Sequence, residues 1–178
     1  MRAMMCAAFI AIVLVIFIGC AATKGDWRTI EIPTDSTMLF ANGLGESANL
    51  QLAIDKAAMN ARTEIGRQLE LKLNDLQKLF AEEIGNTDPE LRTMYTAATK
   101  QVVSLVLKGS KIRQQKYREV KGRYEAITQV EYPIGAANAV LMDEIRKNDS
   151  LYTEFKASKA FKELEAEVEK YELEKKAE

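Results

Sequence analysis

The sequence contains no histidine among its 178 residues. Imidazole is the side chain whose ordinary pKa lies nearest to neutral pH, and it serves in Ser-His-Asp triads and in many metal sites. Catalysis by paired carboxylates stays open in principle, but the Asp and Glu residues mostly fall on helix faces opposite the apolar stripes, where such charges are solvated. We expect no catalytic residues, no metal site, no cofactor and no enzymatic activity.

Cysteine is almost as scarce, because Cys6 and Cys20 are the only two in the chain. Both lie in or beside the apolar N-terminal segment. If that segment is removed and Cys20 is acylated, no pair of cysteines is left to form an internal disulfide, even in an oxidising compartment. The fold must then rest on its apolar core alone.

An excess of positive charge is also missing. Without residues 1–19, which hold one arginine and no acid, 24 basic residues face 26 acidic ones, a net charge of −2. Proteins that bind nucleic acid usually carry a basic patch or stripe. The charge balance therefore argues against a nucleic-acid partner.

The N-terminus has the pattern of a signal peptide. Arg2 supplies a short basic region, and Ala7 to Ile18 is an apolar run without charge. The run ends on Phe17, Ile18 and Gly19 immediately before Cys20, which matches the lipobox of bacterial lipoproteins. We expect cleavage before Cys20 and acylation of its thiol and new amine, with palmitate among the acyl groups, since two or three chains anchor a protein stably.

This segment has two other interpretations. Residues 4–23 could be extended to the roughly 20 residues that a transmembrane helix needs, but this does not explain a cysteine at the end of the run. Cys6 is a rival acylation site, but no apolar run precedes it. Because Ala21 rather than Asp follows Cys20, we expect sorting to the outer membrane.

The next segment, residues 21–36, mixes small, polar and Pro residues without a period. It is interpreted as a lipidated tether, although Trp27, Ile30 and Ile32 could pack on the body or form a short strand. A first strand is predicted over residues 37–42, ending in a turn at Gly43 and Gly45.

Two long helices are predicted after this turn. In residues 47–84 apolar side chains recur at steps of three or four, with Ser47 as the N-cap and Gly85 as the stop. The residues on one face of its first half are small: Ala53, Ala57, Ala58 and Ala61. A second helix should begin near Pro89, after the capping Asp88, and end at Gly109.

Residues 111–120 and 123–132 are predicted to form a β-hairpin around Lys121 and Gly122. Alternation of apolar and polar residues in the second run indicates a half-buried strand. A short helix over residues 135–146 should follow, with Ala137, Leu141 and Ile145 facing inward.

Residues 151–178 are predicted to be one charged helix. Phe161, Leu164, Val168 and Tyr171 fall at steps of three, four and three, the spacing of a coiled-coil seam. Two heptads do not decide between a self-association stripe and a helix that rests on the body. The stripe is the candidate interaction site.

Taken together, the Gly-x-Gly pair at Gly43 and Gly45, the alanine-rich helix and the late hairpin, all behind a lipobox, resemble the Lpp-twenty family of bacterial outer-membrane lipoproteins. The resemblance spans about residues 38–133. It implies a compact body of helices on a small sheet that acts by assembly, like surface antigens and flagellar basal-disk lipoproteins. The one functional position it transfers is the acylated Cys20.

The pair of glycines also fits a dinucleotide-binding turn, G-x-G-x-x-A between a strand and a helix. That motif requires a βαβ unit of about 30 residues with a parallel second strand. Here a helix of nearly forty residues, by its stripe, and then a second helix follow. A tight turn that lets the helix pack on the sheet is the preferred interpretation.

The sequence therefore predicts an α+β fold with a small antiparallel sheet of about three strands in β-α-α-β-β-α order, long helices on one face and a charged C-terminal helix. The expected division is a signal peptide (1–19), a lipidated tether (20–36), an Lpp-twenty-like domain (37–147) and the C-terminal helix (148–178). We expect a non-enzymatic, lipid-anchored cell-envelope protein that forms a homo-oligomer, with other envelope or flagellar proteins as further partners. The alternative is a periplasmic ligand-binding module with a groove between the long helix and the hairpin.

Overall fold

The fold combines a three-stranded antiparallel sheet with long helices, as the sequence predicts. The computed structural model describes residues 26–85 and 88–177. In chain order the elements are β1 (Met38–Ser47), α2 (Leu50–Ile84), α3 (Pro89–Gly109), β2 (Lys111–Val120), β3 (Arg123–Pro133), α4 (Ile134–Arg146), α5 (Asp149–Phe155) and α6 (Lys159–Ala177). Within these described residues no helix is both long and apolar enough to span a membrane.

The sheet has the order β1-β3-β2, with both neighbouring pairs antiparallel. The predicted hairpin of β2 and β3 is confirmed. Its two-residue turn places Lys121 at φ 51° and Gly122 at φ 73°, the left-handed conformations that suit a tight hairpin turn.

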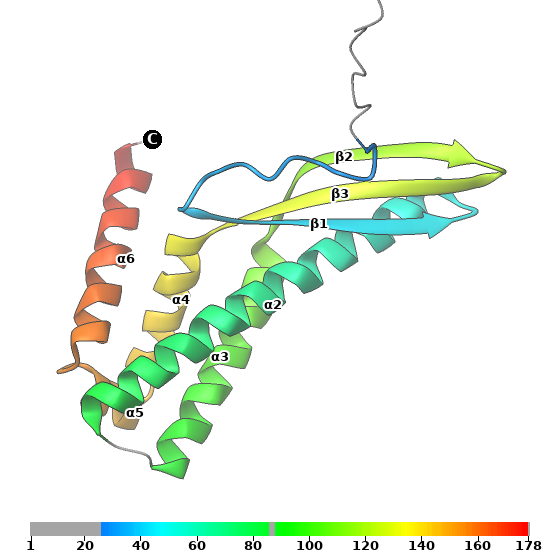
Figure 1. The fold of residues 1–178 in the computed structure, drawn as a ribbon. Coiled ribbons are helices and arrows are strands. Elements are labelled where there is room, and N and C mark those ends of the chain that lie inside the picture. Colours follow the sequence, from blue (N-terminus) through cyan, green and yellow to red (C-terminus); the bar gives the residue numbers. More distant parts are fainter. Residues whose placement is uncertain (1–25, 86–87, 178) are drawn as a thin grey trace, which may run out of the picture.

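Helix α2 crosses one face of the sheet and continues well past its end (Figure 1). Beyond the sheet it contacts α3, α5 and α6, and α4 packs on these three helices, so the molecule has a sheet half and a helical half that share α2. Ala137, Leu141 and Ile145, the predicted inner face of α4, are fully buried in the helical half.

Gly43 and Gly45 lie inside β1, so the predicted turn at these residues is wrong. A Cβ added to either glycine would come within 3.0 Å of the backbone of α2, at Ala57 and at Ala61 or Ala53. The glycines therefore serve close helix-to-sheet packing and leave no phosphate-binding turn between a strand and a helix.

The ends of the first two helices were predicted closely. Helix α2 begins after Asn49, whose side chain accepts a hydrogen bond from the Leu52 amide, so Ser47 is not the N-cap. It ends at Gly85 with φ 65°, as expected. The carboxylate of Asp88 accepts from the Glu90 amide and caps α3, with Pro89 in the first turn.

The predicted single helix over residues 151–178 is two helices, α5 and α6. Ser158 separates them, because its hydroxyl oxygen accepts from the Phe161 amide and donates to the Phe155 carbonyl. The break lets Phe155 enter the core, where its ring stacks on Phe80 at 4.3 Å and meets Tyr95 edge-on at 5.8 Å. The pattern of charged residues over 151–178 did not predict the break between α5 and α6.

Candidate functional site

The expected lipidation site lies outside the described residues. Cys20 and the lipobox residues Phe17, Ile18 and Gly19 precede Asp26, the first residue that the structure describes. The structure describes the chain from the sixth residue after Cys20 onward.

Residues 26–36, called the strap from here on, lie across the face of the sheet opposite α2 (Figure 1). Two side chains of the sheet hold its backbone. The Asn42 side-chain amide donates to the Ile30 carbonyl at 2.6 Å, and that of Gln129 donates to the Glu31 carbonyl at 3.0 Å. Ile30 is buried. Of the interpretations left open for residues 21–36, packing on the body is confirmed for Ile30 but wrong for Ile32, which is 54% exposed.

A cluster of charges and one aromatic ring fixes the start of the strap. The guanidinium of Arg118 lies 4.0 Å from the centre of the Trp27 ring, a cation–π contact. Arg28 and Arg118 both donate to Glu125, at 3.3 and 2.8 Å. The hydrogen bond from Arg118, supported by that from Arg28, holds the pKa of the Glu125 carboxyl below its ordinary value.

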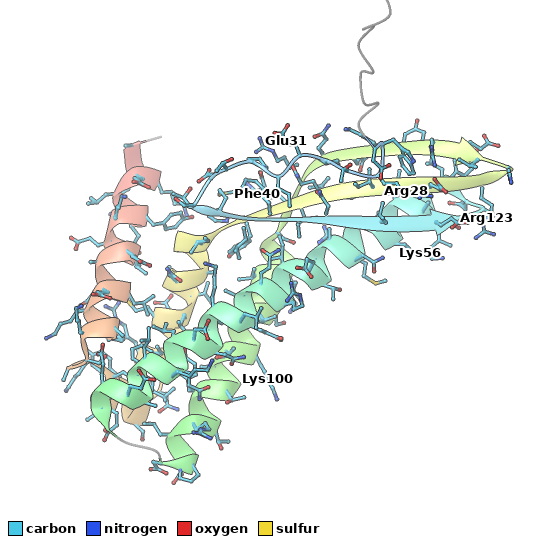
Figure 2. All side chains as sticks on the ribbon, viewed as in Figure 1. Arg28, Glu31, Phe40, Lys56, Lys100 and Arg123 are labelled. Atoms are coloured by element: carbon cyan, nitrogen blue, oxygen red, sulfur yellow. The ribbon has the colours of Figure 1, made fainter. Side chains whose placement is uncertain are left out.

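The strap gives the sheet a second buried face. Figure 2 shows Arg28 and Glu31 on the strap, with Phe40 close to it. Phe40, Ile127 and Gln129 are all buried, although they point away from α2. The sequence held one signal of this face: Ile127, the exception to the alternation in β3.

The candidate interaction stripe on α6 is already used inside the molecule, so its interpretation as a free surface is wrong. Phe161, Leu164 and Val168 are buried in the core cluster of the helical half. Tyr171 is half-buried and packs on Gly135, where an added Cβ would lie 2.5 Å from the Tyr171 ring. The stripe seats α6 on α4 and leaves little apolar surface for a partner.

The groove expected between the alanine-rich face of α2 and the hairpin is closed. Ala53, Ala57 and Ala126 are buried against one another in a small apolar cluster with Tyr124 and Ile54 at its margin. Small residues here bring α2 against the sheet without leaving a space between them.

A groove of about 480 Å³ lies elsewhere, between α2 and α3. Its apolar lining comes from Leu71, Ile84, Leu91, Tyr95 and Phe155, with charged side chains at the margin. The Tyr95 hydroxyl donates to the Leu73 carbonyl at 3.1 Å, and burial raises the pKa of this phenol. A phenol so placed stays protonated near neutral pH and cannot serve there as a base.

The acidic residues with a resolved pKa shift are ion-paired or hydrogen-bonded at the surface. An Arg67 hydrogen bond lowers the pKa of Glu64, as Arg118 does for Glu125. Such carboxylates remain charged near neutral pH and are poor proton donors. Among residues 26–85 and 88–177, no group of three or more Asp, Glu or Cys side chains is placed to hold a metal ion.

No family model matches the chain, and neither a curated protein nor a solved structure matches it. The resemblance to the Lpp-twenty family therefore rests on residues 38–133 themselves.

Proposed function

We propose that this protein is a bacterial lipoprotein of the outer membrane, anchored through acylated Cys20, that acts by protein contacts and self-association and not by catalysis. A place in the Lpp-twenty family is part of this proposal. A role as a surface antigen or as a flagellar or other envelope component follows from that family membership.

The packing of the strap carries the proposal. A flexible tether would leave the body free to point in any direction, but the strap is hydrogen-bonded to β1 and β3 through Asn42 and Gln129. Residues 20–25 can extend over about 20 Å at most. An anchor at Cys20 would therefore hold the body close to the membrane by its sheet half, with the helical half available to other proteins.

The apolar residues that stay exposed supply the contact surface in this account. On α2, Leu71 and Leu79 are 52% and 49% exposed, and they lie eight residues apart on one face of the helix. Surface residues of this kind, rather than the buried stripe of α6, are where self-association should occur.

Fractionation and cross-linking test this function. The wild-type protein should be recovered with outer-membrane fractions and should give cross-linked oligomers there. Leu71→Glu with Leu79→Glu should reduce the oligomers but not the membrane recovery, whereas Glu82→Gln with Lys100→Gln, at exposed positions, should change neither. Recovery in inner-membrane fractions alone, or no oligomer at any cross-linker concentration, would contradict the proposal.

The alternative, a periplasmic ligand-binding module, is favoured by one observation. The groove between α2 and α3 falls within the usual size range of small-molecule sites and has a largely apolar lining with a few polar groups. Binding of a fluorescent fatty acid that is lost in Ala81→Trp, a change that fills the groove, would support this alternative. Unchanged binding in that variant would exclude the groove as its site.

A further inference from the structure

A hollow of about 800 Å³ lies where the last turns of α6 pass the start of β1 and the start of α4. In Figure 1 the C-terminal end of α6 reaches the level of the sheet and the strap. The hollow lies where the strap joins β1, because Ser36, Thr37 and Met38 are part of its lining.

Four lysines line this hollow and come from three elements. Lys72 belongs to α2, Lys111 to β2, and Lys170 and Lys175 to α6. These four lysines span more than one hundred positions of the sequence, so it is the fold that brings them together. The net charge of the whole chain is close to zero.

The acids that line the hollow are already engaged. Glu167 accepts a hydrogen bond from the Asn138 side chain at 2.8 Å, and Glu174 pairs with Lys170 at 3.9 Å. Lys72, Lys111 and Lys175, by contrast, make no ion pair with any residue of 26–85 or 88–177. The lining thus holds four ammonium groups and two carboxylates, an excess of two positive charges.

We propose that this hollow binds a phosphate group. Like charges gathered in a concave site raise the local concentration of anions. Lysine is a common phosphate ligand in proteins, where its ammonium acts as a compact point charge. The volume is large enough for a phosphate ester with the group it carries.

The phosphate has two sources with the same chemistry: the headgroup of an anionic lipid or a soluble phosphate ester. The proposed phosphate site does not depend on acylation of Cys20. A negative result for this site would therefore leave the proposed function untouched, and the reverse also holds. An anchored body would nonetheless bring the hollow within reach of headgroups.

Binding to the full chain in micelles of a neutral detergent tests the site. The three probes are glycerol phosphate, dihexanoyl phosphatidylglycerol and, as a zwitterionic reference, dihexanoyl phosphatidylcholine, each titrated calorimetrically. The test variant is Lys72→Gln with Lys111→Gln. Its matched control is Lys116→Gln with Lys121→Gln, which removes the same charge from exposed lysines of the hairpin that pair with no acid of the described residues and lie outside the hollow. Circular dichroism verifies that all variants fold.

The site predicts that at least one anionic probe binds the wild-type chain and that the test variant loses about tenfold or more in affinity, while the control stays within about twofold. Glycerol phosphate alone identifies a soluble ester as the source, and phosphatidylglycerol alone identifies the lipid headgroup. Equal losses in the two variants, equal binding of phosphatidylcholine, or no binding of either anionic probe would overturn the proposal.

Discussion

The side-chain nitrogen of Gln129 lies 3.1 Å from Oδ1 of Asn42, on the face of the sheet that the strap covers. Gln129 also donates to the Glu31 carbonyl, and Asn42 donates to the Ile30 carbonyl. Two amide side chains from paired positions of β1 and β3 thus bond each other and two successive carbonyls of the strap. Gln129 is 1% exposed, so water cannot replace these bonds.

Replacement of Gln129 by alanine should therefore loosen the strap. Buried acceptors left without a donor cost about 1–3 kcal/mol, and we expect a loss of that size in the free energy of unfolding. Trp27, the single tryptophan, should become more accessible to acrylamide quenching. Gln115→Ala, at an exposed position of β2, is the control and should change neither quantity. Unaltered quenching in Gln129→Ala would show that these bonds do not hold the strap.

Ala57→Leu should destabilise the protein by about 3 kcal/mol, the upper end for overpacking. Ala57 is fully buried against the backbone of β1 at Gly43 and Gly45, which cannot yield as a flexible side chain would. Ala97→Leu on an exposed position of α3 is the control and should stay within about 0.5 kcal/mol. Denaturant unfolding compares the two variants. Equal stability of both would mean that α2 does not lie this close to the sheet.

The buried hydroxyl of Thr99 has no hydrogen-bond partner among the residues that the structure describes. Thr99→Val keeps the shape of the side chain and removes the unpaired group, so we expect a gain of about 1 kcal/mol in stability. Thr93, on the exposed side of the same helix, donates to the Pro89 carbonyl. Thr93→Val should bring no gain. Thermal unfolding distinguishes the two, and a loss of stability in Thr99→Val would indicate that its hydroxyl is satisfied after all.

The Glu125 carboxyl, which binds Arg28 of the strap, should make the stability of the fold depend on pH in the acid range. Its ordinary pKa is 4.5, and the hydrogen bonds from Arg118 and Arg28 lower this value in the folded protein. A lowered pKa means that the carboxylate stabilises the fold above about pH 4.5 and that this contribution is lost as the pH falls through the pKa of the folded protein.

We expect Glu125→Gln to make the loss of stability below pH 4.5 less steep, measured by denaturant unfolding at several pH values. Glu119→Gln, a neighbouring carboxyl without an ion pair to the described residues, should keep the slope of the wild type. Equal slopes in all three proteins would contradict this role of Glu125.

The parts of the fold that were predicted correctly are those with strong local chemistry. Lys121 and Gly122 adopt the positive φ angles of a tight hairpin, and Asp88 with Pro89 begins a helix as this pair usually does. The inner face of α4 followed from its helical period.

The errors arose where distant contacts decide the local structure. Gly43 and Gly45 have the composition of a turn, but the approach of α2 explains why they are glycines. The stripe on α6 has coiled-coil spacing, but α4 of the same chain covers it. The strap has no period at all, so no local pattern could show that Asn42 and Gln129 would bind its backbone.

Incorporation of radiolabelled palmitate tests the central claim, that Cys20 anchors this protein, most directly. Wild-type protein and a Cys20→Ala variant are labelled in cells of a bacterium that processes lipoproteins, with Cys6→Ala as the matched control. We predict label in the wild type and in Cys6→Ala, and none in Cys20→Ala, because the account makes the thiol of Cys20 the acyl acceptor. Equal labelling of the wild type and Cys20→Ala would contradict the account.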